Sequence, residues 1–272
     1  MNKICNQWLF VFLIFFCSIS LFGQTTYTWI GADNGSWATP TNWSPTRTTP
    51  AANNILQFND GTTKTITAVP TQTIGLFVMS GNTNITLQSS SAQTLTIGNG
   101  AGTDLVIPTG SALTLGTNTN VTLAASAAAD ISGTLTINSG RTYNTNGTSV
   151  VTTVTGTVVN AGTITNTTAG KLLFNSGSIY QHNQSGGTLP TSTRNANSTI
   201  DCRLGSAMSL SIGGSSIGIG RLVVNNNTPL TLTSTAAVTL TVNNGTGDDL
   251  VVGSGSSLTI GSTLNITLAS ST

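Results

Sequence analysis

Charged residues are scarce in this 272-residue chain, and glutamate is absent altogether. Lys and Arg together number eight, Asp and Glu number seven, and the acids are all aspartates. The basic residues lie singly along the chain. Because nucleic-acid binding depends on clustered Lys and Arg that displace counterions from phosphates, this composition argues against a nucleic-acid partner. The same scarcity argues against an electrostatic patch for a membrane surface.

Histidine and cysteine are nearly missing as well. His182 is the only histidine, and Cys202 is the only cysteine after residue 17. A zinc site needs about four ligands in one place, which these two residues cannot supply. We interpret His182, in YQHNQSGG, as a polar loop residue. We interpret Cys202 as a small buried hydrophobe, with a free thiol or a pairing outside this chain as alternatives.

The usual catalytic motifs are also absent. A serine nucleophile needs a base and an orienting group, but no G-x-S-x-G motif occurs and only one imidazole exists. Asp248 and Asp249 are adjacent, so on a strand they would face opposite sides and could not act as a glycosidase pair. P-loop and dinucleotide motifs do not occur. We therefore expect no enzyme, no catalytic residue and no cofactor.

The residues that are abundant favour strands. Glu, Lys and Met, which form helices well, are few, whereas Thr, Ser, Asn and Gly supply most of the polar residues. Leu, Ile and Val supply most of the apolar ones, and Thr with the branched aliphatic residues favours β-structure. The sequence predicts an all-β protein with almost no helix.

The first residues predict a secretory signal peptide. Lys3 gives a positive start, and residues 8–16 (WLFVFLIFF) form an apolar run too short for a stable membrane anchor. Small residues follow, and we place the cleavage after Gly23. Residues 1–23 are then the signal peptide, the mature chain has no membrane span, and the protein is secreted or displayed on the cell surface.

An internal repeat runs through the rest of the chain. Residues 74–126 align without a gap to residues 219–271, so that TLTIGNGAGTDLVIPTGSALTLG (94–116) matches TLTVNNGTGDDLVVGSGSSLTIG (239–261). We expect the second copy to be truncated and the chain to be the N-terminal part of a larger protein. Within each copy, short alternating segments such as TLTI recur every eight to ten residues with Gly- and Asn-rich turns between them.

Uniformly short strands and a gapless repeat favour a right-handed parallel β-helix, a β-solenoid, with tandem β-sandwich repeats as the alternative. We assign residues 61–272 to this body. Residues 24–60 hold Trp29, Trp37 and Trp43 and differ from it in composition. We interpret them as an N-terminal cap that covers the first, unpaired rung. The tryptophans are predicted to be cap core, with stacking on sugar rings as an alternative role.

Two stretches of the mature chain carry a family resemblance. TYTWIGADNGSWATPTNWSP (26–45), followed by NNILQFNDG (53–61), resembles the start of many bacterial repeat adhesins. KLLFNSGSIYQHNQSGGTLPTSTRNANSTIDC (171–202) resembles segments of large secreted Bacteroidetes proteins, as does SLFGQ (20–24) near the signal end. That resemblance implies export by type IX secretion. It also implies a tryptophan where this chain has Arg194.

Aspartates near turns are the candidates for a metal site. Asp104 lies in GNGAGTD, and Asp248 and Asp249 lie in NNGTGDD. Gly-Asp turns with backbone carbonyls can hold calcium, but no spaced D-x-D-x-D series occurs, so we expect these side chains to cap turns instead.

Threonine pairs raise a second binding hypothesis. If rungs stack, T-x-T pairs would form ladders that could bind ice or a crystalline polysaccharide. ALTLG (112–116) and DLVIP (104–108) interrupt the pattern, which favours ordinary β-propensity as its cause. The pairs considered are Thr94/Thr96, Thr231/Thr233 and Thr239/Thr241.

We therefore expect a secreted or cell-surface structural and adhesion repeat protein that forms the stalk or attachment region of a larger chain. The alternatives are a carbohydrate- or ice-binding solenoid, or an accessory region of an extracellular polysaccharide-degrading enzyme. Glycans or surfaces are the expected partners, together with end-to-end self-association.

Overall fold

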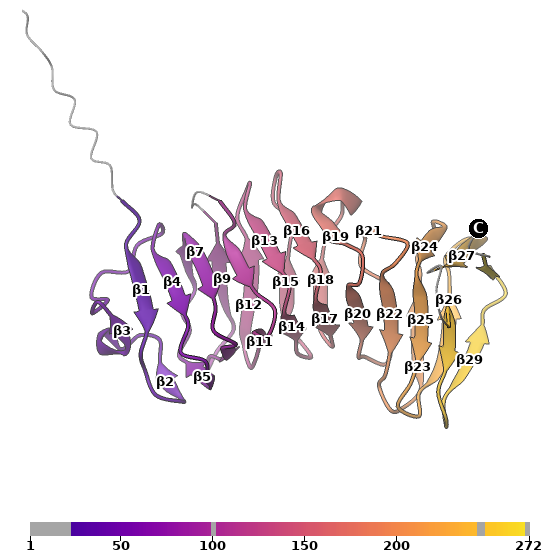
Figure 1. Ribbon diagram of the computed structural model, residues 1–272, viewed down its shortest axis with the longest axis horizontal. Helices are drawn as coiled ribbons and strands as arrows, with labels where there is room; N and C mark the ends of the chain where they lie inside the picture. Colours follow the sequence, from indigo (N-terminus) through magenta and orange to yellow (C-terminus); the bar gives the residue numbers. More distant parts are fainter. Residues whose placement is uncertain (1–22, 99–101, 244–247, 270–272) are drawn as a thin grey trace, which may run out of the picture.

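The chain folds as a β-solenoid of about nine turns (Figure 1). A computed structural model describes residues 23–98, 102–243 and 248–269, so most of the predicted signal peptide lies outside it. Helical structure in the described residues consists of two 3-10 turns, η1 (Pro40–Asn42) and η2 (Ala169–Lys171). None of the helices described is long and apolar enough to cross a membrane. The predicted all-β class is confirmed.

Three sheets form the walls over most of the length, and two further sheets continue them toward the C-terminus. Sheet A contains β1 (Thr26–Trp29), β3 (Trp43–Ser44), β4 (Ile55–Phe58), β7 (Leu76–Met79), β10 (Leu105–Ile107), β13 (Ala128–Ile131), β16 (Val151–Val154), β19 (Leu172–Phe174) and β21 (Thr193–Arg194). Sheet B contains β2 (Gly35–Ser36), β5 (Thr63–Thr67), β8 (Asn84–Leu87), β11 (Ala112–Leu115), β14 (Thr134–Ile137), β17 (Thr157–Asn160), β20 (Ile179–His182), β22 (Thr199–Cys202), β25 (Arg221–Val224) and β28 (Leu250–Val252).

Sheet C contains β6 (Gln72–Ile74), β9 (Gln93–Ile97), β12 (Thr119–Leu123), β15 (Thr142–Asn144) and β18 (Thr163–Thr165). Sheet D contains β23 (Met208–Ser211), β26 (Pro229–Thr233) and β29 (Ser257–Ile260). Sheet E contains β24 (Ile217–Ile219), β27 (Val238–Val242) and β30 (Leu264–Leu268).

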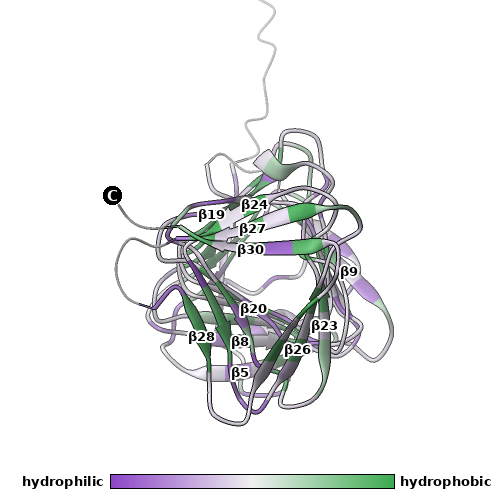
Figure 2. Cartoon of the chain, turned by 90° about the vertical axis from the view of Figure 1, so that its right-hand side faces the viewer, coloured by the Kyte–Doolittle hydropathy of each residue, from purple (hydrophilic) through white to green (hydrophobic). Residues whose placement is uncertain are grey.

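Each turn of the chain visits the walls in the same order. A strand in sheet A is followed by one in sheet B and one in sheet C, after which the chain returns to sheet A one rung further on. After β22, sheet D takes the place of sheet C and sheet E that of sheet A; viewed along the axis, β24, β27 and β30 lie in one layer with β19 (Figure 2). Neighbouring strands are parallel, apart from β1 and β3. This pairing excludes the antiparallel sandwich alternative.

Alternation of apolar and polar residues explains why these segments form solenoid strands. In ALTL and TLTI, every second residue points inward, and Leu113 lies beside Leu135 in the parallel register. The column continues through Val158, Tyr180 and Ile200, and all of these side chains are buried. Each apolar side chain removed from water in this way contributes about 1.5–3 kcal/mol to folding. The core therefore runs as continuous columns along the axis.

The sequence repeat does not contain a whole number of turns. In the first copy β7, β8 and β9 belong to sheets A, B and C, whereas their counterparts β25, β26 and β27 belong to sheets B, D and E. The second copy is thus rotated by one wall relative to the first. Equivalent residues keep their inward or outward direction, but they present their outward side chains to different sides of the molecule.

The tryptophan-rich segment closes the N-terminal end and is continuous with the body. β1 pairs antiparallel with β3 but parallel with β4, so it is already a rung of sheet A. Trp29, Trp37 and Trp43 are buried, with edge-to-face ring contacts at centroid distances of 4.9 Å and 5.1 Å. The column of aromatic rings continues to Phe58 and Phe77, whose stacked rings have centroids 4.5 Å apart. The aromatic cap and the solenoid share one core.

Candidate functional site

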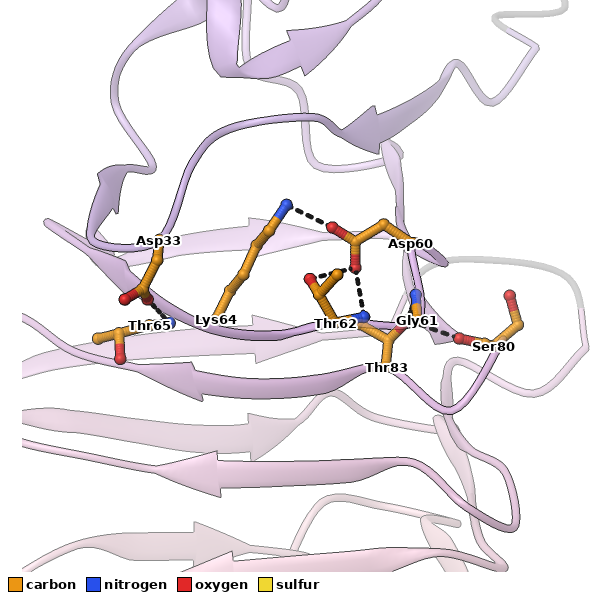
Figure 3. A network of polar contacts seen from close by, with 8 residues as sticks. All are labelled: Asp33, Asp60, Gly61, Thr62, Lys64, Thr65, Ser80 and Thr83. Carbon is orange, nitrogen blue, oxygen red and sulfur yellow. Dashed lines mark hydrogen bonds and ion pairs between the residues drawn. The ribbon is translucent and has the colours of Figure 1, made fainter.

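Charged side chains near the N-terminal end contact β5 of sheet B and the turn before it (Figure 3). Asp33 accepts a hydrogen bond from the backbone N–H of Thr65 at 2.7 Å, across a long stretch of sequence. Asp60 forms an ion pair with Lys64 and accepts two hydrogen bonds from Thr62. Burial alone would raise the pKa of Asp60, but Lys64 and Thr62 together hold it below its usual value. This network braces a turn.

The aspartates considered for calcium lie far apart. Asp104 precedes β10, whereas Asp248 and Asp249 precede β28, several turns further along the axis. The carboxylate of Asp104 is buried and accepts a hydrogen bond from the backbone N–H of Ala128 at 2.8 Å, so it links two rungs. Among the described residues, no three His, Cys, Asp or Glu side chains gather as metal ligands do.

The repeat conserves a backbone bond at these aspartates. The carbonyl oxygen of Asp104 accepts from the N–H of Phe77 at 2.7 Å, and that of Asp249 accepts from Leu222 at 2.8 Å. The two positions are equivalent in the two copies. Both copies therefore keep the same inter-rung backbone contact, which a carbonyl of any residue could make. Asp248 is exposed, and its carbonyl accepts from Arg221 Nε at 3.0 Å.

The three cap tryptophans are enclosed by protein. Trp29 and Trp37 are each 2% exposed and Trp43 is 1% exposed. The Nε1 atom of Trp43 donates to the carbonyl oxygen of Trp37 at 3.0 Å. Rings packed edge to face in this way present no surface to a sugar, so the stacking role is wrong for the folded protein, and the rings act as core.

His182 is buried rather than exposed in a loop, which corrects the interpretation from the sequence. It is the last residue of β20, where the alternation of IYQH turns Tyr180 and His182 inward. His182 Nε2 lies 3.1 Å from the carbonyl oxygen of Gly186, which can only accept, so this nitrogen carries the proton. Nδ1 then accepts from the Tyr180 hydroxyl at 3.2 Å, and that hydroxyl accepts from Asn160 Nδ2 at 3.0 Å.

This internal network is held in a neutral form. Burial lowers the pKa of His182 to about 4, against the opposing effect of the Gly186 hydrogen bond. Burial also raises the pKa of Tyr180 to about 12. In the parallel register Asn160, His182 and Cys202 occupy one inward column, and burial raises the pKa of the Cys202 thiol to about 12. Cys202 is a free, buried cysteine without the thiolate character of a nucleophile.

Arg194 occupies an aromatic environment. Its guanidinium carbon lies 4.4 Å from the ring centroid of Phe174 and 5.0 Å from that of Tyr180. Its two Nη atoms are buried and make no hydrogen bond in the described chain. Burial lowers the pKa of Arg194 to about 10. This is the position where the family resemblance implies tryptophan, and the cation rests on ring faces instead.

The outward side of sheet C is the most regular polar surface of the described chain. We call it the threonine face. Thr96 lies beside Thr73 on one side and Thr122 on the other, and the column continues through Asn144 and Thr165. A parallel column, two residues earlier along each strand, contains Thr94, Asn120, Thr142 and Thr163. Each of the sheet C strands β9, β12, β15 and β18 therefore carries an outward pair of hydroxyl or amide side chains.

The segments that seemed to interrupt the threonine pattern belong to other walls. ALTLG (112–116) forms β11 in sheet B, and DLVIP (104–108) forms β10 in sheet A. Thr231 and Thr233 lie in sheet D, which continues the threonine face, whereas Thr239 and Thr241 lie in sheet E. These two segments therefore do not interrupt the column of threonines in sheet C.

The other walls differ in outward chemistry. In sheet A, Ile55 lies beside Leu76, and Val78 lies beside Val106. In sheet B, a column of Thr86, Thr114 and Thr136 gives way to aliphatic, amide and acidic residues toward the C-terminus, namely Val159, Gln181 and Asp201. Sheet C keeps hydroxyl and amide groups in both columns over four successive strands, from β9 to β18. In sheet E the same pattern spans only β27 and β30, where Thr239 lies beside Asn265 and Thr241 beside Thr267.

Comparison with known proteins gives no relative for this chain: no family model, curated protein or solved structure matches it. The candidate surface is therefore defined by its own geometry.

Proposed function

We propose that this protein is a secreted or cell-surface structural and adhesion protein whose solenoid serves as a rigid stalk. The observation that supports this best is the single continuous core, which runs from the tryptophan cap through buried Leu240 and Val242 of β27 without a break between subdomains. Parallel strands spaced about 4.8 Å apart over about nine turns give a rod of roughly 40 Å. A rod of this kind holds attached groups at a fixed distance.

The chemistry of the walls supports a structural role. Ion pairs are few among the described residues, and the large pKa shifts of His182 and Cys202 reflect burial inside the core. Neutral hydroxyl and amide side chains cover much of the outside. The apolar run before Gly23 supports export, and the resemblance to repeat adhesins supports a surface location.

Shortening the rod by whole turns tests the stalk. Leu113 lies beside Leu135 in the register, so deletion of residues 113–134 removes one turn and preserves the inward and outward pattern. The matched control keeps the full length and carries Leu113→Asp with Leu135→Asp, because two carboxylates in the buried column disrupt the core without shortening the rod. In cells that produce the protein, we expect the one-turn deletion to remain on the surface with weaker attachment, and the control to be lost through misfolding.

Two results would contradict the proposal. Protease treatment of intact cells should remove the protein, so a protected, internal pool would rule out a surface stalk. Disruption of the gene should reduce attachment of the cells to surfaces or to one another, and unchanged attachment would rule out an adhesive role.

A further inference from the structure

We propose that the threonine face binds the surface of ice. The inference goes beyond the stalk and does not depend on it. The face consists of the outward side chains of β6, β9, β12, β15 and β18: Thr73, Thr94, Thr96, Asn120, Thr122, Thr142, Asn144, Thr163 and Thr165.

The arrangement is periodic in two directions. Across the strands, equivalent side chains repeat at about 4.7–4.9 Å, and along a strand the two columns lie about 6.6 Å apart. The first spacing is fixed by backbone hydrogen bonds between rungs and the second by the extended backbone of each strand, so the array is rigid before any ligand arrives. A dissolved small molecule uses a concave and mostly apolar pocket, which this open sheet does not provide. A periodic solid can instead contact many equivalent groups at once.

Hydroxyl groups on this face are available to a ligand, whereas the Oδ1 atoms of Asn120 and Asn144 accept from the backbone N–H groups of Thr142 and Asn146. The hydroxyls of Thr96, Thr122 and Thr165 make no hydrogen bond within the described chain. A hydroxyl donates one hydrogen bond and accepts others, as each water molecule of an ice lattice does. The threonine methyl groups between them limit the contacts of liquid water with the surface. The outward positions of these five strands include no charged or aromatic side chain.

β-Propensity does not account for the pattern. Val and Ile favour strands as strongly as Thr does, and they occupy the outward positions of sheet A, such as Ile55 and Val106. Asn is unfavourable in strands, yet Asn120 and Asn144 continue the two columns. Small hydrogen-bonding side chains therefore occupy the outward positions of sheet C for a reason other than strand propensity.

The rotation of the repeat places further hydroxyls in line with this face. Because the second copy is turned by one wall, the counterpart of β9 leaves this side, and segments equivalent to β8 and β11 take its place as β26 and β29. Thr231 is the copy of Thr86 and lies beside Ser209, whereas Thr233 stands where the first copy has Gln88 and lies beside Ser211. Copying of the repeat therefore explains the hydroxyl of Thr231 but not that of Thr233.

The threonine face lacks aromatic rings, and this favours ice over crystalline polysaccharide as its ligand. Recognition of sugars relies on an apolar platform with a few polar groups, as in other organic ligand sites. The threonine face offers no ring on which a pyranose could stack. Its regularly repeated hydroxyl groups can instead form hydrogen bonds with the water molecules of an ice surface.

The experiment measures incorporation of the fluorescently labelled mature chain into a slowly growing ice surface, together with the shape of single ice crystals. We expect the protein to enter the ice and to produce facets. Thr96→Tyr and Thr122→Tyr each raise a ring above the hydroxyl plane and should abolish both effects. Thr114→Tyr is the matched control, because Thr114 is an equally half-buried outward threonine on the next wall, and it should leave both effects intact. Circular dichroism and thermal unfolding confirm that each variant is folded.

Three results would overturn the proposal. The unaltered chain could be excluded from ice and leave crystals round. The Thr114→Tyr control could lose binding as fully as Thr96→Tyr. Finally, the unaltered chain could sediment with crystalline cellulose or chitin in a manner that Thr96→Tyr abolishes, without any effect on ice, which would assign the face to a glycan solid.

Discussion

The guanidinium carbon of Arg194 lies 4.4 Å from the ring centroid of Phe174, inside the solenoid and with both Nη atoms buried and unpaired. A cation taken out of water without a counter-charge is costly, and contact with ring faces compensates only part of that cost. The buried guanidinium of Arg194 therefore destabilises the folded protein.

Replacing this arginine should stabilise the protein. Arg194→Met keeps a long flexible side chain and removes the buried charge, so the free energy of unfolding should rise by about 1 kcal/mol or more. Urea unfolding followed by circular dichroism measures the change. Arg141→Met is the control, because Arg141 is half-exposed and should change stability by less than about 0.5 kcal/mol. A loss of stability in Arg194→Met would show that the ring contacts outweigh the burial cost.

His182 should make stability depend on pH. Its pKa in the folded state is about 4, below the value of about 6.5 expected in the unfolded chain. The unfolded state therefore binds the proton first as pH falls, and stability decreases between pH 6.5 and pH 4, by about 3 kcal/mol in total.

The test for His182 compares unfolding free energies at several pH values. His182→Gln removes the titrating group and can still donate to the Gly186 carbonyl, so its stability should change much less over this range. If both proteins show the same pH dependence, the histidine is not the group responsible.

The thiol of Cys202 should not react with disulfide reagents while the protein is folded. Only the thiolate reacts with disulfide reagents, and burial raises the pKa of this thiol to about 12. We expect labelling of the mature chain by a chromogenic disulfide to be negligible in buffer and complete in denaturant. Ser209→Cys gives a matched exposed thiol seven residues further along the chain, and it should react at once. Rapid reaction of Cys202 itself would contradict its burial.

Trp43 should be needed for folding and irrelevant to soluble sugars. Removal of its ring by Trp43→Ala opens a cavity at the cap and should cost about 3–5 kcal/mol. Ile30→Ala, at a side chain that is 59% exposed beside the cap, should cost little. In the unaltered chain, tryptophan fluorescence should not change on addition of oligosaccharides. A saturable change would restore a binding role for these rings.

The fold followed from the sequence because alternation in short segments fixes which side chains point inward. TLTI and ALTL bury Leu and Ile wherever they occur, and Trp29, Trp37 and Trp43 could be assigned to a cap from their clustering. The same alternation in IYQH, applied to His182, would have placed it in the core. We interpreted it as a loop residue because its neighbours in sequence are polar.

The assignment of strands to walls could not be obtained in this way. It depends on how many residues each turn contains, and this number varies from rung to rung: Ile200 pairs with Leu222, whereas Leu222 pairs with Leu250. The threonine face exists only once β9, β12, β15 and β18 are placed on one side. For the same reason, the sequence repeat alone gave no sign that its second copy is rotated.

The central claim is one uninterrupted parallel solenoid, and distances along one wall test it most directly. Thr63, Thr157 and Thr199 lie in one outward column of sheet B, four and six rungs apart. Nitroxide labels on cysteines at 63 and 157, or at 63 and 199, in a mature chain with Cys202→Ala, report their separation by pulsed electron paramagnetic resonance. Stacked rungs predict backbone separations of about 19 Å and 29 Å, each with a narrow distribution. Distances that fail to increase with the number of rungs would contradict the account.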